Sequence, residues 1–268
     1  MTAEMFFWVG VPYAALAALI IGLIWRWKTD QFGWTSRSSQ WHENAILRWA
    51  SPLFHFGIIF VFFGHVAGML VPKSVTAAMG VSDHLYHLGA VGMGGIAGLM
   101  TLVGATALIY RRFVIKSVRL KTTRGDIIMY ILLMIPIVLG FAATLINQVF
   151  GKPGGYDYRE TIGPWIRSIL TFQPQPELMT DVPLSFQLHV IAGLLLFAIL
   201  PFTRLVHIVS APVAYPTRPD IVYRSREESN ALNGRVGASG NAQRDYSRGW
   251  KPVRKQSHES EDVPYVGA

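Results

Sequence analysis

Five long apolar runs constrain most strongly what this chain can fold into. They cover residues 5–25, 49–71, 88–110, 127–150 and about 184–209. A helix needs about 20 apolar residues to cross the hydrocarbon core of a bilayer. Barrel strands instead alternate over about 10 residues, and these runs do not alternate. The sequence therefore predicts an all-α integral membrane protein with five transmembrane helices.

Composition narrows the class of protein further. The 268 residues are 51% hydrophobic and only 15% charged, which argues against a soluble domain. The chain contains no cysteine, which excludes disulfides, iron–sulfur ligation, zinc-thiolate sites and covalently attached haem. Any metal must therefore be held by nitrogen or oxygen. The first run follows Glu4 without a basic segment or a cleavage site, so we expect a retained span rather than a signal peptide.

The basic residues predict the orientation of the spans. Ten of them follow the first and third runs: Arg26, Lys28, Arg37, Arg48, Arg111, Arg112, Lys116, Arg119, Lys121 and Arg124. The alternate loops hold four: Lys73, Lys152, Arg159 and Arg167. Cytoplasmic loops carry the excess of Lys and Arg, so the N-terminus is predicted outside and the C-terminus cytoplasmic. Orientation thus accounts for the net charge of +8, and we expect no nucleic-acid partner.

Two polar regions flank or follow the last span. Residues 151–183 form a long external loop in which residues 165–172 resemble a short interfacial helix, either a cap over a site or a surface helix. From about residue 217 the chain becomes polar and poor in apolar residues. We therefore divide the chain into a membrane domain, residues 1–226, and a disordered cytoplasmic tail, residues 227–268.

Four of the eight histidines lie inside apolar runs, where a titratable ring is costly and indicates function. His55 and His65 are separated by about 15 Å of helical rise. His189 and His207 are separated by about 27 Å, or five whole turns, and so are predicted to share one face. Because the second and fifth spans run in opposite directions, His55 is expected beside His207 near the cytoplasm. His65 is expected beside His189 near the outer side.

Two facing imidazoles without a carboxylate or thiolate suit bis-histidine haem better than zinc or an iron oxygenase site. The preferred hypothesis is therefore two stacked b-type haems, one near each face. The unequal spacings on the two helices require an adjustment, and we expect a bend at Pro201 to supply it.

Further residues have two interpretations each. Arg204 can neutralise a haem propionate or reach the interface from a helix end. His84 and His87, which flank Tyr86, can bond a quinone oxygen or be ordinary loop residues. Glycines in the third run, including the Gly94 and Gly98 pair, and others beside the histidines allow close approach of a helix or of a flat ligand. His42 and His258 receive no role. The glycines beside the histidines are Gly57, Gly64, Gly68 and Gly193.

Three stretches carry a resemblance to a known family. They are SPLFHFGIIFVFFGHVAGMLVP, LHVIAGLLLFAILPFTRLVHI and PVAYPTR, with further matches at residues 37–40 and 122–126. These stretches closely resemble the gamma subunit of membrane-bound respiratory nitrate reductase, a family of dihaem cytochromes b, from the first span to about Arg226. The resemblance implies that His55 and His207 ligate an inner haem iron, and that His65 and His189 ligate an outer one.

The resemblance also implies a function. Quinol, either menaquinol or ubiquinol, is oxidised near the outer face of a prokaryotic cytoplasmic membrane, and the electrons cross through the haems. They pass to a cytoplasmic iron–sulfur beta subunit and then to a molybdenum alpha subunit that reduces nitrate in anaerobic respiration. One departure is that residues 83–87 read DHLYH where the family often has a lysine implicated in quinol binding.

Two alternatives remain open at this stage. One is a dihaem quinone-linked cytochrome b of another redox complex, such as nitrite oxidoreductase. The other, from a different class, is a proton-coupled transporter with a proton-relaying set of histidines. A purely structural anchor would leave the four buried histidines without a reason.

Overall fold

The computed structural model describes residues 2–36, 38–152 and 154–210, which belong to one compact unit. Over these residues all regular structure is helical, and five helices are long and apolar enough to cross a membrane. The predicted all-α fold with five spans is confirmed. The spans cover Ala3–Thr29, Ala45–Leu70, Asp83–Val114, Arg124–Val149 and Leu184–Phe202.

The spans differ in their make-up. The first joins α1 to α2 through the turn η1, the third is α5 alone, and each of the other three is one α-helix followed by a π-helical or 3₁₀ turn. The α-helices are α1 Ala3–Met5, α2 Val11–Thr29, α3 Ala45–His65, α4 Lys73–Ala78, α5 Asp83–Val114, α6 Lys116–Arg119, α7 Arg124–Thr144, α8 Ile162–Leu170 and α9 Leu184–Ile199. The π-helical turns are η1 Phe6–Gly10, η3 Val66–Leu70 and η4 Leu145–Val149. The 3₁₀ turns are η2 Gln31–Gly33, η5 Pro176–Met179, η6 Leu200–Phe202 and η7 Arg204–Ile208.

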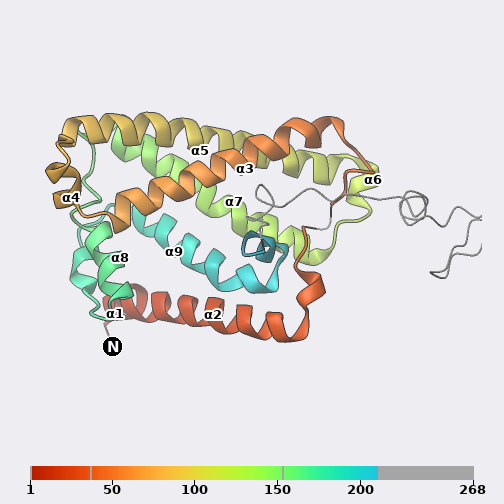
Figure 1. Ribbon diagram of the computed structural model, residues 1–268, viewed down its shortest axis with the longest axis horizontal. Coiled ribbons are helices and arrows are strands. Elements are labelled where there is room, and N and C mark those ends of the chain that lie inside the picture. Colours follow the sequence, from red (N-terminus) through yellow and green to blue (C-terminus); the bar gives the residue numbers. More distant parts are fainter. Residues whose placement is uncertain (1, 37, 153, 211–268) are drawn as a thin grey trace, which may run out of the picture. The chain divides into compact units, whose positions relative to one another are not determined.

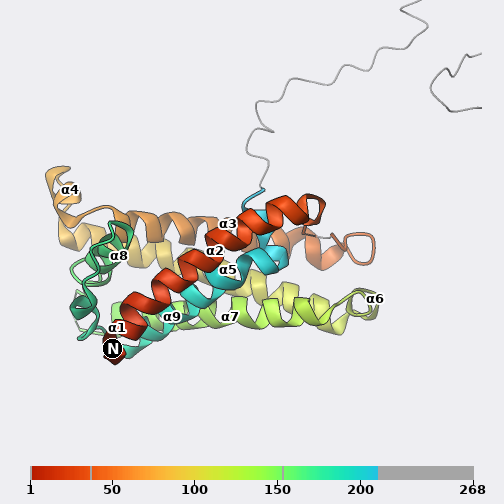
Figure 2. The same cartoon turned by 90° about the horizontal axis from the view of Figure 1, so that it is seen from below.

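The long helices lie side by side (Figures 1 and 2). α3 packs on α5, α5 on α7, and α9 between α7 and α2. The short helices α1, α4 and α8 gather at one end of the bundle, and α6 lies at the other (Figure 1). All three π-helical turns belong to the end that carries α8. Such turns are frequent at functional sites.

Glycine permits the closest helix contact, between α3 and α5. A Cβ added at Gly104 would lie 2.5 Å from the backbone nitrogen of Phe54, and one at Gly57 would lie 2.6 Å from that of Thr101. The Gly94 and Gly98 pair singled out in the sequence makes no equivalent contact. A Cβ at Gly94 meets nothing within 4 Å, whereas one at Gly98 would meet Phe141 of α7 at 3.1 Å.

The fifth span is broken at Pro201, where the sequence predicted a bend, but the prediction of five whole helical turns between His189 and His207 was wrong. α9 ends at Ile199, Pro201 lies in η6, and Thr203 is fully extended with φ −120° and ψ 179° before η7 begins. Proline has no N–H to continue the helix, so the chain turns instead of completing five regular turns. With this break in the fifth span, His207 lies beside His55 while His189 lies beside His65, although the two pairs are spaced differently along the chain.

The external loop folds against the end of the bundle. In α8, Trp165 is 2% exposed and Ile162 is 1% exposed, and both belong to a core cluster with Trp8. The indole nitrogen of Trp165 donates to the backbone oxygen of Trp8 over 3.0 Å. α8 also packs on η3, the turn that follows His65. It is thus a buried part of the protein rather than a surface helix.

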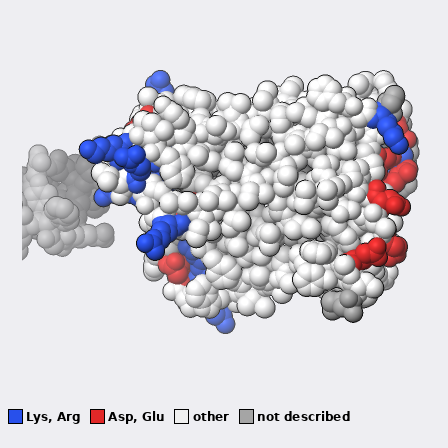
Figure 3. Space-filling model, turned by 180° about the vertical axis from the view of Figure 1, so that it is seen from behind, with Lys and Arg blue, Asp and Glu red and all other residues white. Residues whose placement is uncertain are grey.

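Charge is segregated along the bundle (Figure 3). Lys and Arg side chains predominate at the end that carries α6, and Asp and Glu side chains at the opposite end, where a few basic side chains also lie; an uncharged belt separates the two ends. Because an uncharged belt is what a bilayer requires of the surface it covers, the bundle has the surface of a multi-pass membrane protein.

Candidate functional site

The structure brings the four intramembrane histidines together in two pairs. His55 of α3 and His207 of η7 have ring centroids 6.4 Å apart, with an angle of 63° between the ring planes. His65, the last residue of α3, and His189 of α9 have centroids 5.9 Å apart at 41°. Each pair therefore joins the second span to the fifth, at two different depths.

The four imidazoles share one hydrogen-bonding pattern. In each ring Nδ1 lies within hydrogen-bond distance of a backbone carbonyl oxygen. The acceptors are Ser51 for His55 at 2.7 Å, Val61 for His65 at 2.7 Å, Pro136 for His189 at 2.9 Å and Arg204 for His207 at 2.5 Å. A carbonyl can only accept, so Nδ1 carries the hydrogen, and the neutral ring presents the lone pair of Nε2. Metal-ligating histidines are held in this way.

The spacing of the rings also fits a shared metal. With metal–nitrogen bonds of about 2 Å, two imidazoles on opposite sides of one ion have centroids about 6 Å apart. Within the described part of the chain no cluster of three or more His, Asp or Glu side chains is positioned to hold a metal ion. Haem needs only two ligands from the protein because the porphyrin supplies the other four nitrogens. The residues present therefore fit haem.

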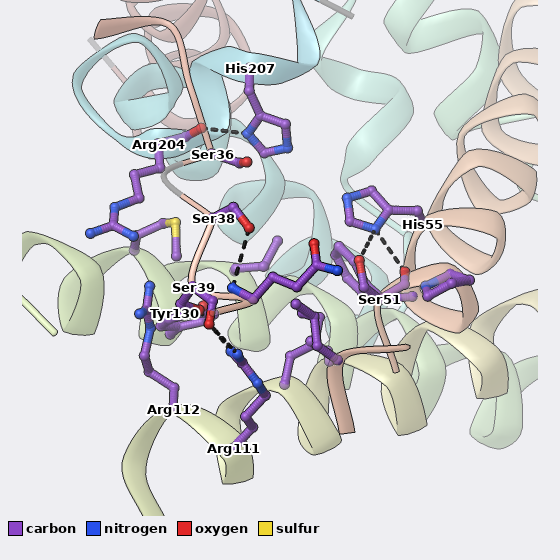
Figure 4. Close-up of a pocket in the computed structure, with 18 of the residues that line it drawn as sticks. Ser36, Ser38, Ser39, Ser51, His55, Arg111, Arg112, Tyr130, Arg204 and His207 are labelled. Carbon is purple, nitrogen blue, oxygen red and sulfur yellow. Dashed lines mark hydrogen bonds between the residues drawn. The ribbon is translucent and has the colours of Figure 1, made fainter. Parts of the chain in front are cut away.

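A cavity of about 580 Å³ adjoins the inner pair. Both His55 and His207 line it, and Arg111, Arg112 and Arg204 stand on its other sides (Figure 4). The polar and basic lining consists of Ser36, Ser38, Ser39, Gln40, Asn44, Arg48, Ser51, Arg111, Arg112, Tyr130 and Arg204. Such a lining suits a flat apolar ligand that carries anionic groups at one edge.

One of these arginines, Arg111, is buried and paired with a carboxylate. Arg111, 3% exposed, forms an ion pair with Glu43 and donates to the Ser39 hydroxyl over 2.9 Å. Burial alone would raise the pKa of Glu43, but the Ile46 N–H and the Arg111 guanidinium outweigh it and lower that pKa below its usual value. Glu43 is therefore charged at neutral pH and fixes the loop before α3 against α5.

Arg204 binds a residue that the sequence analysis did not single out. Its Nε lies 2.5 Å from Oδ1 of Asp126, and its Nη2 lies 2.7 Å from Oδ2. Asp126 is only 2% exposed. The pattern Thr123-x-x-Asp126 at the start of α7 indicates a capping box in the sequence. It does not indicate that Asp126 also pairs with an arginine far along the chain.

The predicted quinol residues lie at the outer end, on the first two turns of α5. His84 is exposed, whereas Tyr86 and His87 are half-buried. The Arg159 guanidinium lies 3.8 Å from the centre of the Tyr86 ring. Tyr158, which the sequence analysis missed, is hydrogen-bonded to Tyr86, and burial followed by this bond raises the pKa of its hydroxyl.

These tyrosines approach the outer histidine pair. A Cβ added at Gly68, three residues after His65, would lie 3.2 Å from the Tyr158 hydroxyl oxygen and 3.3 Å from that of Tyr86. The two hydroxyls therefore stand one helical turn beyond His65. Nothing in the sequence spacing of Tyr158 relates it to that histidine, because the two lie on segments far apart along the chain.

Lys73 ties the outer segments to one another. Its ammonium lies 2.8 Å from Glu160, 2.9 Å from Asp157 and 3.1 Å from Asp83. The hydrogen bonds that Lys73 donates to Asp157, Glu160 and Asp83 raise the pKa of Lys73, so it stays charged. The cluster joins the start of α4, the start of α5 and the external loop.

α7 positions the outer pair from the side. Pro136 supplies the carbonyl that accepts from His189, and a Cβ added at Gly140 would lie 2.6 Å from Cε1 of the same ring. Pro136 and Gly140 are therefore further site residues that sequence reasoning missed. Pro136 is visible in the sequence, but the contact of its carbonyl with His189 of α9 is not.

The fold and the site together define a class: a helical multi-pass membrane protein that presents two facing pairs of imidazoles at different depths. The family model described as nitrate reductase gamma subunit matches residues 4–226. The chain belongs to this family.

Curated relatives agree with the family match. The nitrate reductase gamma chain of Bacillus subtilis is 44% identical over 219 residues, which cover 82% of this chain and 97% of that one. The respiratory nitrate reductase 2 gamma chain of Escherichia coli is 35% identical over 224 residues, 83% of this chain and 97% of that one. The nitrate reductase-like protein NarX of Mycobacterium tuberculosis is 50% identical over 223 residues, and the match spans only 34% of its length.

Proposed function

We propose that this chain is the membrane cytochrome b subunit of a respiratory nitrate reductase and that it oxidises quinol near the outer face. The observation that carries the proposal is the common arrangement of the four imidazoles. All four have Nδ1 engaged by a backbone carbonyl, and all four face a second ring about 6 Å away.

Each pair would hold one b-type haem. His55 and His207 are the proposed ligands of the inner iron, and His65 and His189 those of the outer iron. Haem, when bound, supplies reversible one-electron transfer at iron. The arginines around the inner cavity, Arg204 among them, are suited to neutralise propionates.

Quinol would meet the protein at the outer end. Tyr86 and Tyr158 offer hydroxyls one turn beyond His65, and His87 and His84 offer imidazoles on the same side. These groups can orient a quinol hydroxyl and accept its proton for release outside. Electron movement inward against the membrane potential then costs about 2.3 kcal/mol per charge per 100 mV.

The acceptor would be a separate protein on the cytoplasmic side. The sequence has no cysteine with which to ligate an iron–sulfur cluster. Electrons that reach the inner pair must therefore leave through a partner, proposed to be an iron–sulfur beta subunit that serves a molybdenum alpha subunit. The inner pair lines the same cavity as Arg48, Arg111 and Arg112, basic residues of the loops predicted to face the cytoplasm.

The test is haem quantification by pyridine haemochrome on the purified chain and on four variants, His55→Ala, His65→Ala, His189→Ala and His207→Ala. We expect two b haems per wild-type chain and loss of one in each variant. Redox titration should show the same haem lost for His55→Ala and His207→Ala, and the other for His65→Ala and His189→Ala. His42→Ala, an exposed loop histidine, is the control and should retain both. A wild-type chain from haem-sufficient cells that carries no porphyrin would refute the proposal.

A further inference from the structure

Asp126 is a buried carboxylate with no part in the proposed electron path. It lies in the first turn of α7, where its Oδ2 accepts from the Thr123 N–H over 2.9 Å and its own N–H donates to the Thr123 hydroxyl over 3.2 Å. This capping box would exist without any other partner. The carboxylate is nevertheless 2% exposed, which is more burial than a helix cap needs.

The reason for this burial is an ion pair with Arg204. The two side chains meet through two contacts, 2.5 Å from Nε to Oδ1 and 2.7 Å from Nη2 to Oδ2. A planar guanidinium that binds both oxygens of a carboxylate has its orientation fixed as well as its position. A second guanidinium, that of Arg112, lies 4.0 Å from Oδ2.

Arg204 in turn belongs to the segment that carries His207. It is the first residue of η7, and its carbonyl oxygen accepts from Nδ1 of His207 over 2.5 Å. The helix has already ended at Ile199, so helical hydrogen bonding does not hold this segment to α9. The tethers around it come from side chains: Arg26 donates to the carbonyls of Pro201 and Thr203, over 2.6 Å and 2.9 Å, and Asp126 holds Arg204.

We propose that Asp126 is a positioning residue for the inner histidine pair. Through Arg204 it fixes η7 against α7, so that the His207 imidazole faces His55. It also places a negative charge beside the cationic wall of the inner cavity. This inference rests on the proposed function, because its consequences are measured on the haem that the inner pair would hold.

The charge gives the sign of the effect. A negative charge near an iron stabilises the oxidised, more positive form, so its removal favours reduction. In Asp126→Asn the midpoint potential of the inner haem should move upward, and its low-spin ferric EPR signal should shift because the ring of His207 is less constrained. The potential and signal of the outer haem should stay at their wild-type values.

The experiment is a redox titration, followed optically and by EPR, on membranes that contain the full chain. Asp126→Glu keeps the charge and should return the inner haem toward wild-type values. Thr123→Ala is the matched control, because it removes the helix cap but leaves the carboxylate and Arg204. It should leave both haems unchanged.

A double variant tests the route through Arg204. Arg204→Gln should disturb the same haem, and Asp126→Asn combined with it should add little further change, since the two act as one unit. If Asp126→Asn does not accumulate in the membrane, the test rests on Arg204→Gln alone. A wild-type midpoint potential and EPR signal for the inner haem of Arg204→Gln would then overturn the inference. Wild-type potentials and EPR signals in Asp126→Asn would overturn it as well. A wild-type chain without b haem would instead refute the proposed function.

Discussion

At the scale of single residues, the site depends on backbone carbonyls as much as on side chains. His55 and His65 use the carbonyl four residues earlier on their own helix, at Ser51 and Val61. His189 uses that of Pro136 on a neighbouring helix. A carbonyl cannot be removed by mutation, so the tautomer of each ring is protected against most substitutions. Only a shift of the helix that bears the ring or the carbonyl can disturb it.

Gly140→Ala tests this dependence at the outer pair. The new Cβ would lie 2.6 Å from Cε1 of His189, so the ring or one helix must move. We expect a loss of about 1–3 kcal/mol in the free energy of unfolding, typical of overpacking. The outer haem should show a displaced EPR signal or lower occupancy, and the inner haem should be unchanged.

Gly10→Ala is the control for that substitution. Gly10 lies in the first span, away from α7, and its Cβ would meet only the Met5 carbonyl oxygen of that same span, at 3.8 Å. Both haems should then keep their wild-type signals. An outer haem that is unaffected by Gly140→Ala would show that α7 does not position His189.

At the scale of elements, the contact of α3 with α5 is set by small residues. Gly104→Ala places a methyl group 2.5 Å from the Phe54 nitrogen, against backbone that cannot yield without moving a helix. We expect the free energy of unfolding to fall by about 1–3 kcal/mol, measured by thermal denaturation in detergent. Gly94→Ala on the same helix meets nothing within 4 Å and should denature at the wild-type temperature or above. Equal effects of the two substitutions would contradict this account.

The elements also show what the sequence could predict. All five spans were located, because hydropathy over about 20 residues reports directly on burial in a bilayer. Their ends were placed a few residues short, since helices extend into the polar interface: α3 begins at Ala45 rather than residue 49, and α5 at Asp83 rather than residue 88. A bend at Pro201 was predicted, but the end of the helix at Ile199 was not, because the residues that follow remain apolar. Pro201 was its only signal.

The pairing of the histidines could also be predicted from the sequence, whereas the groups that support them could not. The antiparallel order of the second and fifth spans was enough to bring each histidine near its partner. The supporting groups were not predictable, because they come from other segments: Asp126 meets Arg204 across 78 residues of chain. Pairing within one helix follows from periodicity, whereas pairing between helices needs their packing.

At the scale of the whole molecule, the segregation of charge decides which pair faces which compartment. The cysteine-free sequence makes this directly measurable, since one introduced cysteine is the only thiol. Ser74 on α4 and Lys121 after α6 are both exposed and lie at opposite ends. In intact cells a membrane-impermeant maleimide should label Ser74→Cys and should spare Lys121→Cys until the cells are opened. The positive-inside rule is the physical reason for this expectation.

The reverse labelling pattern would contradict more than the topology. It would place Tyr86, Tyr158 and the outer histidine pair on the cytoplasmic side, where protons from quinol would not be released outward. The inner pair would then face away from any cytoplasmic electron acceptor, although both pairs would still bind haem. The labelling result is therefore independent of haem content, and only the two together support a subunit that carries electrons inward and leaves protons outside.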